Sequence, residues 1–177
     1  MLRLKNDEYL VAVYGTLKRG YWNHSVMKEA GGEYVGDGIT LDTGYLFNVG
    51  FPYWLPKKLA DSLHLDIATE PKHLIVEVYK VKDLEPLDIL EGYPTHYTRE
   101  NTPVFLLEGD ANVDSELKIK QVVMPLIYIP ANFYPGCAEL ISDKLYKELT
   151  LVNPFANNKR YKIAATYWTE GIEPDLF

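Results

Sequence analysis

The chain has 177 residues, 47% of them hydrophobic and 24% charged, and a net charge of −7 at pH 7. This composition is typical of a globular protein rather than a disordered one, and the length predicts a single domain, 1–177, with a sizeable core. The acidic charge argues against nucleic acid as a general partner, because phosphate binding requires a basic surface. The single cysteine, Cys137, excludes an internal disulfide and a cysteine-based zinc site, and we expect a buried thiol there.

Other sequence features narrow the class of protein further. The four histidines lack HExxH or similar ligand spacing, so we expect no metal site. The N-terminal segment has no apolar stretch like that of a signal peptide, and no apolar run is long enough to cross a bilayer. We therefore expect a cytoplasmic protein that does not associate with membranes. The sequence gives no indication of the oligomeric state.

The N-terminal half predicts mainly short strands. Tyr9–Tyr14 is a compact apolar run ended by a glycine, which is typical of a buried strand. Asn23 can cap a short helix that runs to about Ala30 and is closed by two glycines. Two short strands interrupted by glycines follow, and then an irregular or edge segment, because proline cannot donate into a strand ladder. These are Tyr34–Thr40, Leu41–Phe47 and Phe51–Pro56.

The second half contains the clearest strand and a well-marked helix. His73–Val81 is rich in residues that favour strands. Asp83–Glu91 predicts a short helix, with Asp83 as N-cap, Pro86 in the first turn and Gly92 at its end. The remaining predictions are two long strands, a helix and a last extended segment: Tyr97–Leu107, Lys118–Ile129, Glu139–Leu149 and Tyr161–Trp168.

The order of these elements predicts the fold class. Helices are few and do not alternate with strands, which disfavours a doubly wound parallel sheet. We expect an α+β fold, in which a small, mixed, curved or partly closed sheet carries a few flanking helices.

The first place where chemistry is expected is the turn after the first strand, Gly15–Gly20. Glycine lets a backbone approach a ligand closely, and successive N–H groups in such a turn can bind an anion. The segment has neither the GxxxxGK[ST] pattern of a P-loop nor GxGxxG, so a nucleoside triphosphate is not the expected ligand. The alternative is a plain turn that ends a strand.

The second place is Glu91 on the predicted helix. At about 100° per residue, Glu91 falls between Leu84 and Leu87, inside the apolar stripe. Burial and the negative end of the helix dipole both raise the pKa of a carboxyl, toward the range in which it acts as a general base. The alternative is a capping or salt-bridged glutamate at a frayed helix end. If the site is real, the Glu91 carboxyl should face a cavity beside the loop.

Two other charged residues compete for a role. Glu77 lies in the middle of the strongest strand, and we expect an exposed position on a half-solvated sheet. Arg99 follows Tyr97 and is either a carboxylate clamp, a partner for Glu91 or a surface cation.

Both places resemble one family. Val11–Gly20 (VAVYGTLKRG), followed by Asn23-His24, resembles the N-terminal signature of the γ-glutamylcyclotransferase-like (AIG2-like) family. Leu87–Arg99 (LDILEGYPTHYTR) is similar to that family's segment around its catalytic glutamate, and Val76–Tyr79 to the preceding strand. The match looks closest to the γ-glutamylamine cyclotransferase branch. It covers a family core of about 9–130.

The resemblance implies a barrel-like sheet and assigns roles to particular residues. Glu91 would be the catalytic base, and the backbone of the YGTL segment would hold the γ-glutamyl group. The residues implied in substrate binding are Tyr14, Gly15, Thr16, Leu17, Tyr97 and Tyr128, with support from Arg99 and Asn23.

The implied reaction is intramolecular. Glu91 takes a proton from the α-ammonium of a γ-glutamyl substrate, and the freed amine attacks its own γ-carbonyl. The products are 5-oxoproline and a released amine or amino acid. Enzyme and substrate supply every reacting group, so no metal or cofactor is required.

Two segments depart from the family pattern and leave alternatives open. Lys57–Lys72 is longer than expected, charged and without glycine, and it borders the expected leaving-group side. The addition at 136–177 suits a lid, an oligomer contact or a feature of this chain alone. A related reaction on glutathione is therefore one alternative. A non-catalytic module that binds a small ligand or a protein on the same fold is another.

Overall fold

The computed structural model describes residues 1–21, 23–48, 52–65, 67, 71–109, 118–131 and 150–152. These residues form a nine-stranded sheet and three short helices, α1 (His24–Glu29), α2 (Lys57–Ser62) and α3 (Glu85–Glu91). The strands are β1 (Tyr9–Val13), β2 (Glu33–Asn48), β3 (Pro52–Pro56), β4 (Lys72–Val81), β5 (Tyr97–Asn101), β6 (Val104–Glu108), β7 (Lys118–Val123), β8 (Leu126–Pro130) and β9 (Thr150–Val152).

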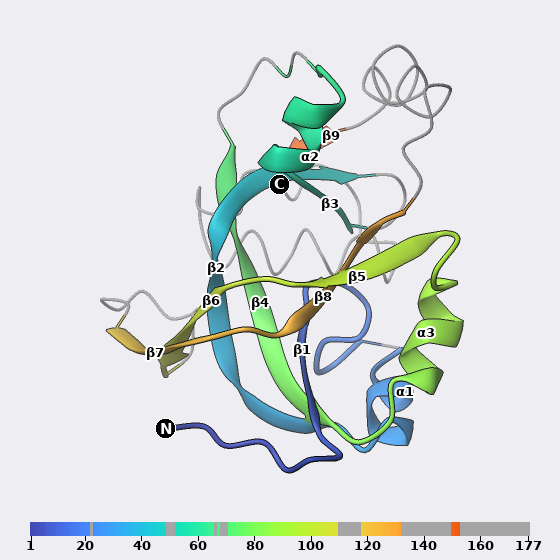
Figure 1. The fold of residues 1–177 in the computed structure, drawn as a ribbon, viewed down its shortest axis with the longest axis vertical. Helices are drawn as coiled ribbons and strands as arrows, with labels where there is room; N and C mark the ends of the chain where they lie inside the picture. Colours follow the sequence, from blue (N-terminus) through green and yellow to red (C-terminus); the bar gives the residue numbers. More distant parts are fainter. Residues whose placement is uncertain are drawn as a thin grey trace.

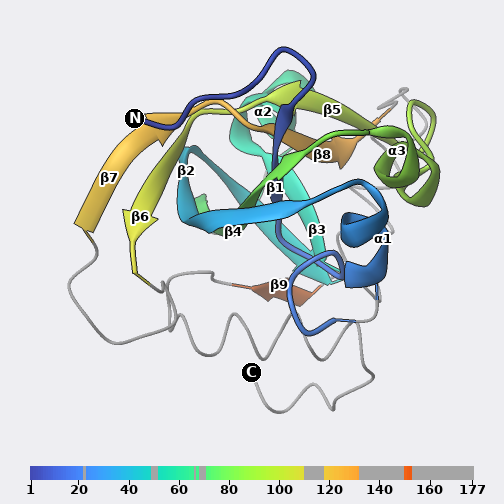
Figure 2. The same cartoon turned by 90° about the horizontal axis from the view of Figure 1, so that it is seen from below.

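The sheet is mixed and strongly curved. Its strand order is β5-β8-β1-β4-β2-β6-β7, with β3 and β9 also paired to β2. Only β1 and β8 are parallel among the described pairs. Figure 1 shows α1 and α3 together on one flank, with α2 at the far end of the molecule. Figure 2 shows β6 and β7 on the side opposite to α1 and α3. The predicted α+β class with a partly closed sheet is confirmed.

The first strand is buried on both faces, which explains its unbroken apolar sequence. Leu10 and Ala12 pack into one hydrophobic cluster, while Val11 and Val13 pack into a second. The second cluster also contains residues of α1 and α3 and of the turn after β1. The end of β1 is therefore held between the sheet and the two helices.

The region predicted as two short strands is one long strand. β2 runs from Glu33 to Asn48, and register shifts against β4 absorb its irregularity between Tyr34 and Gly36 and between Ile39 and Thr43. The glycines therefore bend the strand instead of ending it. The segment predicted as irregular or edge-like forms β3, whose described ladder is with β2.

By contrast, each of the two long strands predicted later in the chain is divided into two strands in the structure. Tyr97–Leu107 is divided into β5 and β6, and Lys118–Ile129 into β7 and β8. Pro103 and Pro125 lie at the two breaks, where the missing N–H ends the ladder. The N–H of Thr102 donates to the carbonyl of Pro125 over 2.9 Å, so the two breaks lie together.

The C-terminal predictions lie largely outside the described residues. These are Cys137, the helix Glu139–Leu149 and the segment Tyr161–Trp168. Of 136–177, only β9 is described, and it pairs with the end of β2. Within the described part of the chain, no helix has the length and apolar character needed to span a membrane.

Candidate active site

The loop that follows β1 begins at a firmly held tyrosine. The Tyr14 hydroxyl donates to the carbonyl of Tyr128 over 3.1 Å and accepts the N–H of Trp54 at 3.4 Å. The Tyr14 ring is buried and faces the core. Tyr14 therefore fixes where the loop leaves the sheet, while the backbone that follows it turns outward.

The backbone of this loop has space beside it. A Cβ atom built on Gly15 or Gly20 would meet no other atom within 4 Å. The turn is closed by the N–H of Lys18, which donates to the carbonyl of Gly15 at 3.1 Å. No hydrogen bond runs from the N–H groups of Gly15, Thr16 or Leu17 to another described residue. These N–H groups therefore suit an anionic ligand or a developing oxyanion.

The start of α1 supports the loop from beneath. Nδ2 of Asn23 donates to Oγ1 of Thr16 over 2.9 Å, and Nδ1 of His24 lies 2.9 Å from the carbonyl of Leu17. Asn23 occupies the N-cap position, but its side chain makes no capping hydrogen bond. The predicted capping role was wrong, because the amide is used on the loop instead.

Glu91 lies at the end of α3, on the side that faces the protein. Leu84 and Leu87 are buried, as predicted, whereas Leu90 is 38% exposed and Ile89 is 73% exposed. Glu91 is partly buried, and this burial raises the pKa of its carboxyl to about 7. No hydrogen bond or ion pair to the carboxyl is found among the described residues. Gly92 then ends the helix in the left-handed conformation, with φ of 63°.

The N-terminus of α3 differs slightly from the prediction. The helix begins at Glu85, and Leu84 occupies the N-cap position assigned to Asp83. The Asp83 carboxylate still accepts the N–H of Glu85 at 2.9 Å, so it satisfies a donor of the first turn.

A second carboxylate of α3, Asp88, is the centre of a polar network. The Arg99 guanidinium binds it through two hydrogen bonds, Nε to Oδ1 at 2.9 Å and Nη2 to Oδ2 at 3.0 Å. The Tyr128 hydroxyl donates to Oδ1 over 2.6 Å. Burial, the Asp88 hydrogen bond and the nearby Glu91 charge all raise the pKa of Tyr128, so its hydroxyl remains a donor. Arg99 is therefore the partner of Asp88, and the pairing with Glu91 that was one of its predicted roles is not seen.

Asp88 had no predicted role, although the sequence contained a signal for it. Asp88 precedes Glu91 by three residues, and side chains at that spacing share one face of a helix. An acidic residue so close to the apolar stripe requires a cation or a hydrogen-bond donor. Arg99 and Tyr128 provide these groups from neighbouring strands, where they are register partners.

The predicted residues therefore come from four elements that meet. Leu17 of the loop, Leu87 of α3 and Tyr128 of β8 belong to one hydrophobic cluster, and Tyr97 of β5 packs against it. Asp88, which accepts the Tyr128 hydroxyl, lies three residues before Glu91 on α3. The loop, the helix carrying Glu91 and both tyrosines thus border one region of the molecule.

The prediction for Glu77 was wrong. Glu77 is only 3% exposed, because the loop after β1 covers this face of β4. The carboxylate accepts the N–H of Arg19 at 2.9 Å and the hydroxyl of Tyr79 at 2.6 Å. Local sequence patterns do not reveal this contact, because Arg19 and Glu77 are 58 positions apart.

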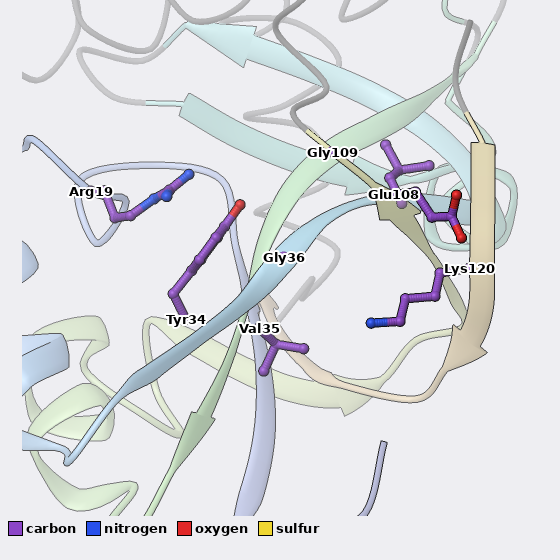
Figure 3. A pocket seen from close by; sticks show the side chains of 8 residues that line it. Arg19, Tyr34, Val35, Gly36, Glu108, Gly109 and Lys120 are labelled. Atoms are coloured by element: carbon purple, nitrogen blue, oxygen red, sulfur yellow. The ribbon is translucent and has the colours of Figure 1, made fainter. Parts of the chain in front are cut away.

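An open pocket of about 560 Å³ meets the loop at Arg19. Figure 3 shows the Arg19 side chain extending toward Tyr34, with Lys120 on another wall. The pocket therefore presents cations from two separate elements. Its lining residues are Arg19, Tyr34, Val35, Gly36, Leu107, Glu108, Gly109 and Lys120. Among the described residues, no group of histidine, cysteine or acidic side chains is arranged to hold a metal.

Together these features define a class of small α+β protein in which a loop with available N–H groups packs into the same hydrophobic cluster as a helix that ends in a partly buried glutamate. The chain belongs to the family described as gamma-glutamyl cyclotransferase, AIG2-like, whose model matches residues 11–126. The resemblance of the YGTLKRG and LEGYP segments is thereby confirmed at the level of the family.

Individual relatives agree with this assignment. A protein of Methanocaldococcus jannaschii is 30% identical over 141 residues, which cover 78% of this chain and 95% of that protein. A Drosophila melanogaster protein is 38% identical over 105 residues, covering 56% of this chain and 62% of its own length. Both are named, provisionally, as gamma-glutamylcyclotransferases. These names support cyclotransferase activity in general terms.

A solved structure confirms the fold. The crystal structure of an AIG2-like protein from Mus musculus matches with a TM-score of 0.54 and 26% identity. The match covers 74% of this chain and 82% of the mouse chain. The curved sheet is therefore that of the AIG2-like proteins.

Proposed function

We propose that this protein is a γ-glutamyl cyclotransferase that converts a γ-glutamyl amine, or a related γ-glutamyl amino compound, into 5-oxoproline and the free amine. The observation that carries the proposal is the position of Glu91, a partly buried carboxylate without a hydrogen bond or ion pair among the described residues, on a helix that packs into the same cluster as the loop. Burial brings the pKa of its carboxyl to about 7. A base that works near neutral pH requires such a pKa, and a purely structural glutamate has no need of it.

Glu91 is proposed as the general base. It removes a proton from the α-ammonium group of the substrate, and the freed amine attacks the γ-carbonyl carbon of the same molecule. A C–N bond forms and closes the five-membered ring, and the C–N bond to the leaving amine breaks. The proton held by Glu91 passes to the leaving nitrogen, so that the carboxylate is restored. The ring nitrogen loses its second proton as the intermediate collapses, and the released amine takes up this proton and departs as an ammonium ion. Because both reacting groups belong to one substrate, the protein mainly folds the substrate and moves a proton.

The loop is proposed to hold the glutamyl end of the substrate. We infer that the N–H groups of Gly15, Thr16 and Leu17 bind an anionic group, either the substrate α-carboxylate or the oxyanion that forms at the γ-carbon. Asn23 and His24 support this role from α1, since each contacts the loop directly. The Tyr128 hydroxyl donates to Asp88, so we assign Tyr128 to shaping the site beside Glu91.

A product assay tests this proposal. The protein is incubated with a panel of γ-glutamyl amines and with glutathione, and 5-oxoproline is measured. Wild type should form 5-oxoproline from at least one γ-glutamyl amine, and Glu91→Gln should lose the activity by about 10²-fold or more. Glu85→Gln is a matched control, because Glu85 is an exposed carboxylate at the other end of the same helix.

Each of three other outcomes of the assay would favour a different alternative to the proposed function. Turnover of glutathione alone would move the substrate class to γ-glutamyl peptides. Equal activity of Glu91→Gln and wild type would show that Glu91 is not the base. Binding of substrates without 5-oxoproline formation would favour the non-catalytic binding module on the same fold.

A further inference from the structure

Two buried carboxylates face each other on neighbouring strands below the loop. Asp37 of β2 and Glu77 of β4 are register partners, and they are 1% and 3% exposed. Like charges directly opposite each other destabilise a strand pair, and buried carboxylates require compensation. Glu77 is also the register partner of Val13, the last residue of β1, so this pair lies where the loop begins.

Arg19 of the loop contributes to this compensation. Its backbone N–H donates to Oε2 of Glu77 at 2.9 Å, and its Nε lies 3.4 Å from Oε1 of the same carboxylate. Its Nη2 lies 3.9 Å from Oδ1 of Asp37. The guanidinium side chain is 44% exposed, whereas the side chains of the two carboxylates are nearly fully buried. Arg19 thus covers the carboxylate pair from the solvent side.

Two tyrosines complete the arrangement and hold Arg19 in place. The hydroxyls of Tyr79 and Tyr34 donate to Glu77 and Asp37, at 2.6 Å and 2.9 Å. The Arg19 guanidinium carbon lies 3.6 Å from the centroid of the Tyr34 ring, and Figure 3 shows the two side chains next to each other. The Tyr79 ring also packs against His24, which itself contacts the loop at Leu17. Glu77 is therefore connected to the loop through Arg19 and, by way of Tyr79, through His24.

We propose that Glu77 is a positioning residue that fixes the ligand-binding conformation of the loop 15–20 by binding both the backbone and the side chain of Arg19. This role rests on the proposed function, because it matters for catalysis only if the loop holds the substrate. Glu77 holds the loop from the side of the sheet, while Asn23 and His24 hold it from α1. The N–H groups of Gly15, Thr16 and Leu17 are thereby kept in one orientation before substrate binds, which is what preorganised binding requires.

A purely structural role is the competing explanation. In that case the carboxylates, tyrosines and Arg19 would stabilise the β2–β4 ladder as a whole, and their loss would weaken the fold everywhere. The positioning role instead predicts a local effect, confined to the loop and to substrate binding. The two explanations therefore differ in which backbone amides lose their protection from hydrogen exchange: those of the loop alone, or those of the whole sheet.

Amide hydrogen exchange on the full-length protein without substrate tests this difference. Glu77→Gln keeps the size of the side chain and one acceptor, and Arg19→Ala removes the partner from the exposed side. Both variants should increase exchange of the hydrogen-bonded loop amides of Lys18 and Arg19 by about 10-fold or more, and leave the amides of β1 and β4 unchanged. Glu33→Gln is the matched control, since Glu33 is an exposed carboxylate on the same β2–β4 ladder and should change neither region.

A double variant and a kinetic comparison sharpen the test. Arg19→Ala combined with Glu77→Gln should open the loop little more than either change alone, because both remove the same guanidinium–carboxylate contact. In the 5-oxoproline assay, both single variants should raise KM by about 10-fold with a smaller change in kcat. Their pH–rate profiles should stay as in wild type, because the base is untouched. Arg19→Lys, which keeps the charge but not the planar fork, should restore part of the loss.

Two results would overturn the positioning role. One is loop exchange at the wild-type rate in both single variants. The other is a uniform rise in exchange across the sheet, which would assign Glu77 to the stability of the fold. The exchange measurement needs no substrate, so it still decides the role of Glu77 if wild type forms no 5-oxoproline and the proposed function fails.

Discussion

The hydroxyl of Tyr128 donates a 2.6 Å hydrogen bond to Oδ1 of Asp88, and this bond joins β8 to the helix that carries Glu91. Arg99 binds both oxygens of the same carboxylate from β5. Asp88 is thus held from two strands, while Glu91, one helical turn later, has no such partner among the described residues. The two carboxylates of α3 are therefore suited to different tasks: Asp88 to fixing the helix, Glu91 to accepting a proton.

The first prediction concerns the pH dependence of activity. Only ionised Glu91 can accept a proton, and the pKa of its carboxyl is about 7. Below that pH, kcat/KM should fall by about tenfold per pH unit. Rates measured from pH 5 to 9 in wild type should show this limb with an apparent pKa near 7. A limb centred near 4.5 would show that Glu91 is not desolvated in the active protein.

The second prediction concerns stability. The pKa of Glu91 is higher in the folded chain than its ordinary value of 4.5, so the folded state binds more protons between pH 4.5 and 7. Stability therefore falls as the pH rises through this window, and the full penalty is present above pH 7. Glu91→Gln removes the ionisable group and should be more stable than wild type at pH 8, by at most about 3 kcal/mol.

Denaturant unfolding at pH 5 and pH 8 measures this difference. The advantage of Glu91→Gln should be larger at pH 8 than at pH 5, and Glu85→Gln, at an exposed position, should show no such trend. An advantage of Glu91→Gln over wild type that stays the same or shrinks from pH 5 to pH 8 would contradict the burial of the Glu91 carboxyl.

Much of this arrangement is visible in the sequence. The apolar run of β1, the strand β4 and the position of Glu91 beside Leu87 all follow from local periodicity, which reports the face that a residue presents. The divisions at Pro103 and Pro125 were also predictable, because proline rarely occurs inside a paired strand. The prediction of two unbroken long strands was therefore wrong for a reason that the sequence itself contains.

The pairing of charges was not predictable in the same way. Glu77 appeared solvent-exposed, because its alternation along β4 does not say what covers that face. Arg19 covers it from a loop on a distant part of the chain. Asp88 shows the same limit, since its partners Arg99 and Tyr128 come from two strands whose register depends on the whole sheet. Local sequence patterns indicate on which face of a strand or helix a residue lies, whereas the partners of its side chain depend on tertiary structure.

The third prediction compares two ion pairs on neighbouring residues of β5. The pair of Arg99 and Asp88 is bidentate, with side chains 22% and 20% exposed, whereas Glu100 binds Lys58 at the surface, with side chains 38% and 56% exposed. Asp88→Ala should destabilise the protein by about 2–3 kcal/mol, because it leaves a partly buried guanidinium and the Tyr128 hydroxyl without their acceptor. Glu100→Ala should change stability by less than about 1 kcal/mol.

Urea unfolding of the two variants provides the measurement. Equal effects would show that the Asp88 network contributes no more than a surface pair. Tyr128→Phe removes the hydrogen bond to Asp88 but keeps the bidentate pair. Its loss of stability should therefore fall between those of Asp88→Ala and Glu100→Ala, at about 1 kcal/mol.

The last prediction concerns the support of the loop from α1. Nδ2 of Asn23 donates to Oγ1 of Thr16 and makes no capping hydrogen bond, so Asn23→Ala should loosen the loop without weakening the helix. We expect a rise in the KM of the 5-oxoproline reaction of about 5–10-fold, from the loss of about 1 kcal/mol. Thr16→Val removes the acceptor and keeps the shape, so it should have the same effect. The double variant should be no worse than either single one, because the same bond is lost. Additive losses would show that Asn23 and Thr16 act independently, and a fall in helix stability with unchanged KM would return Asn23 to the capping role.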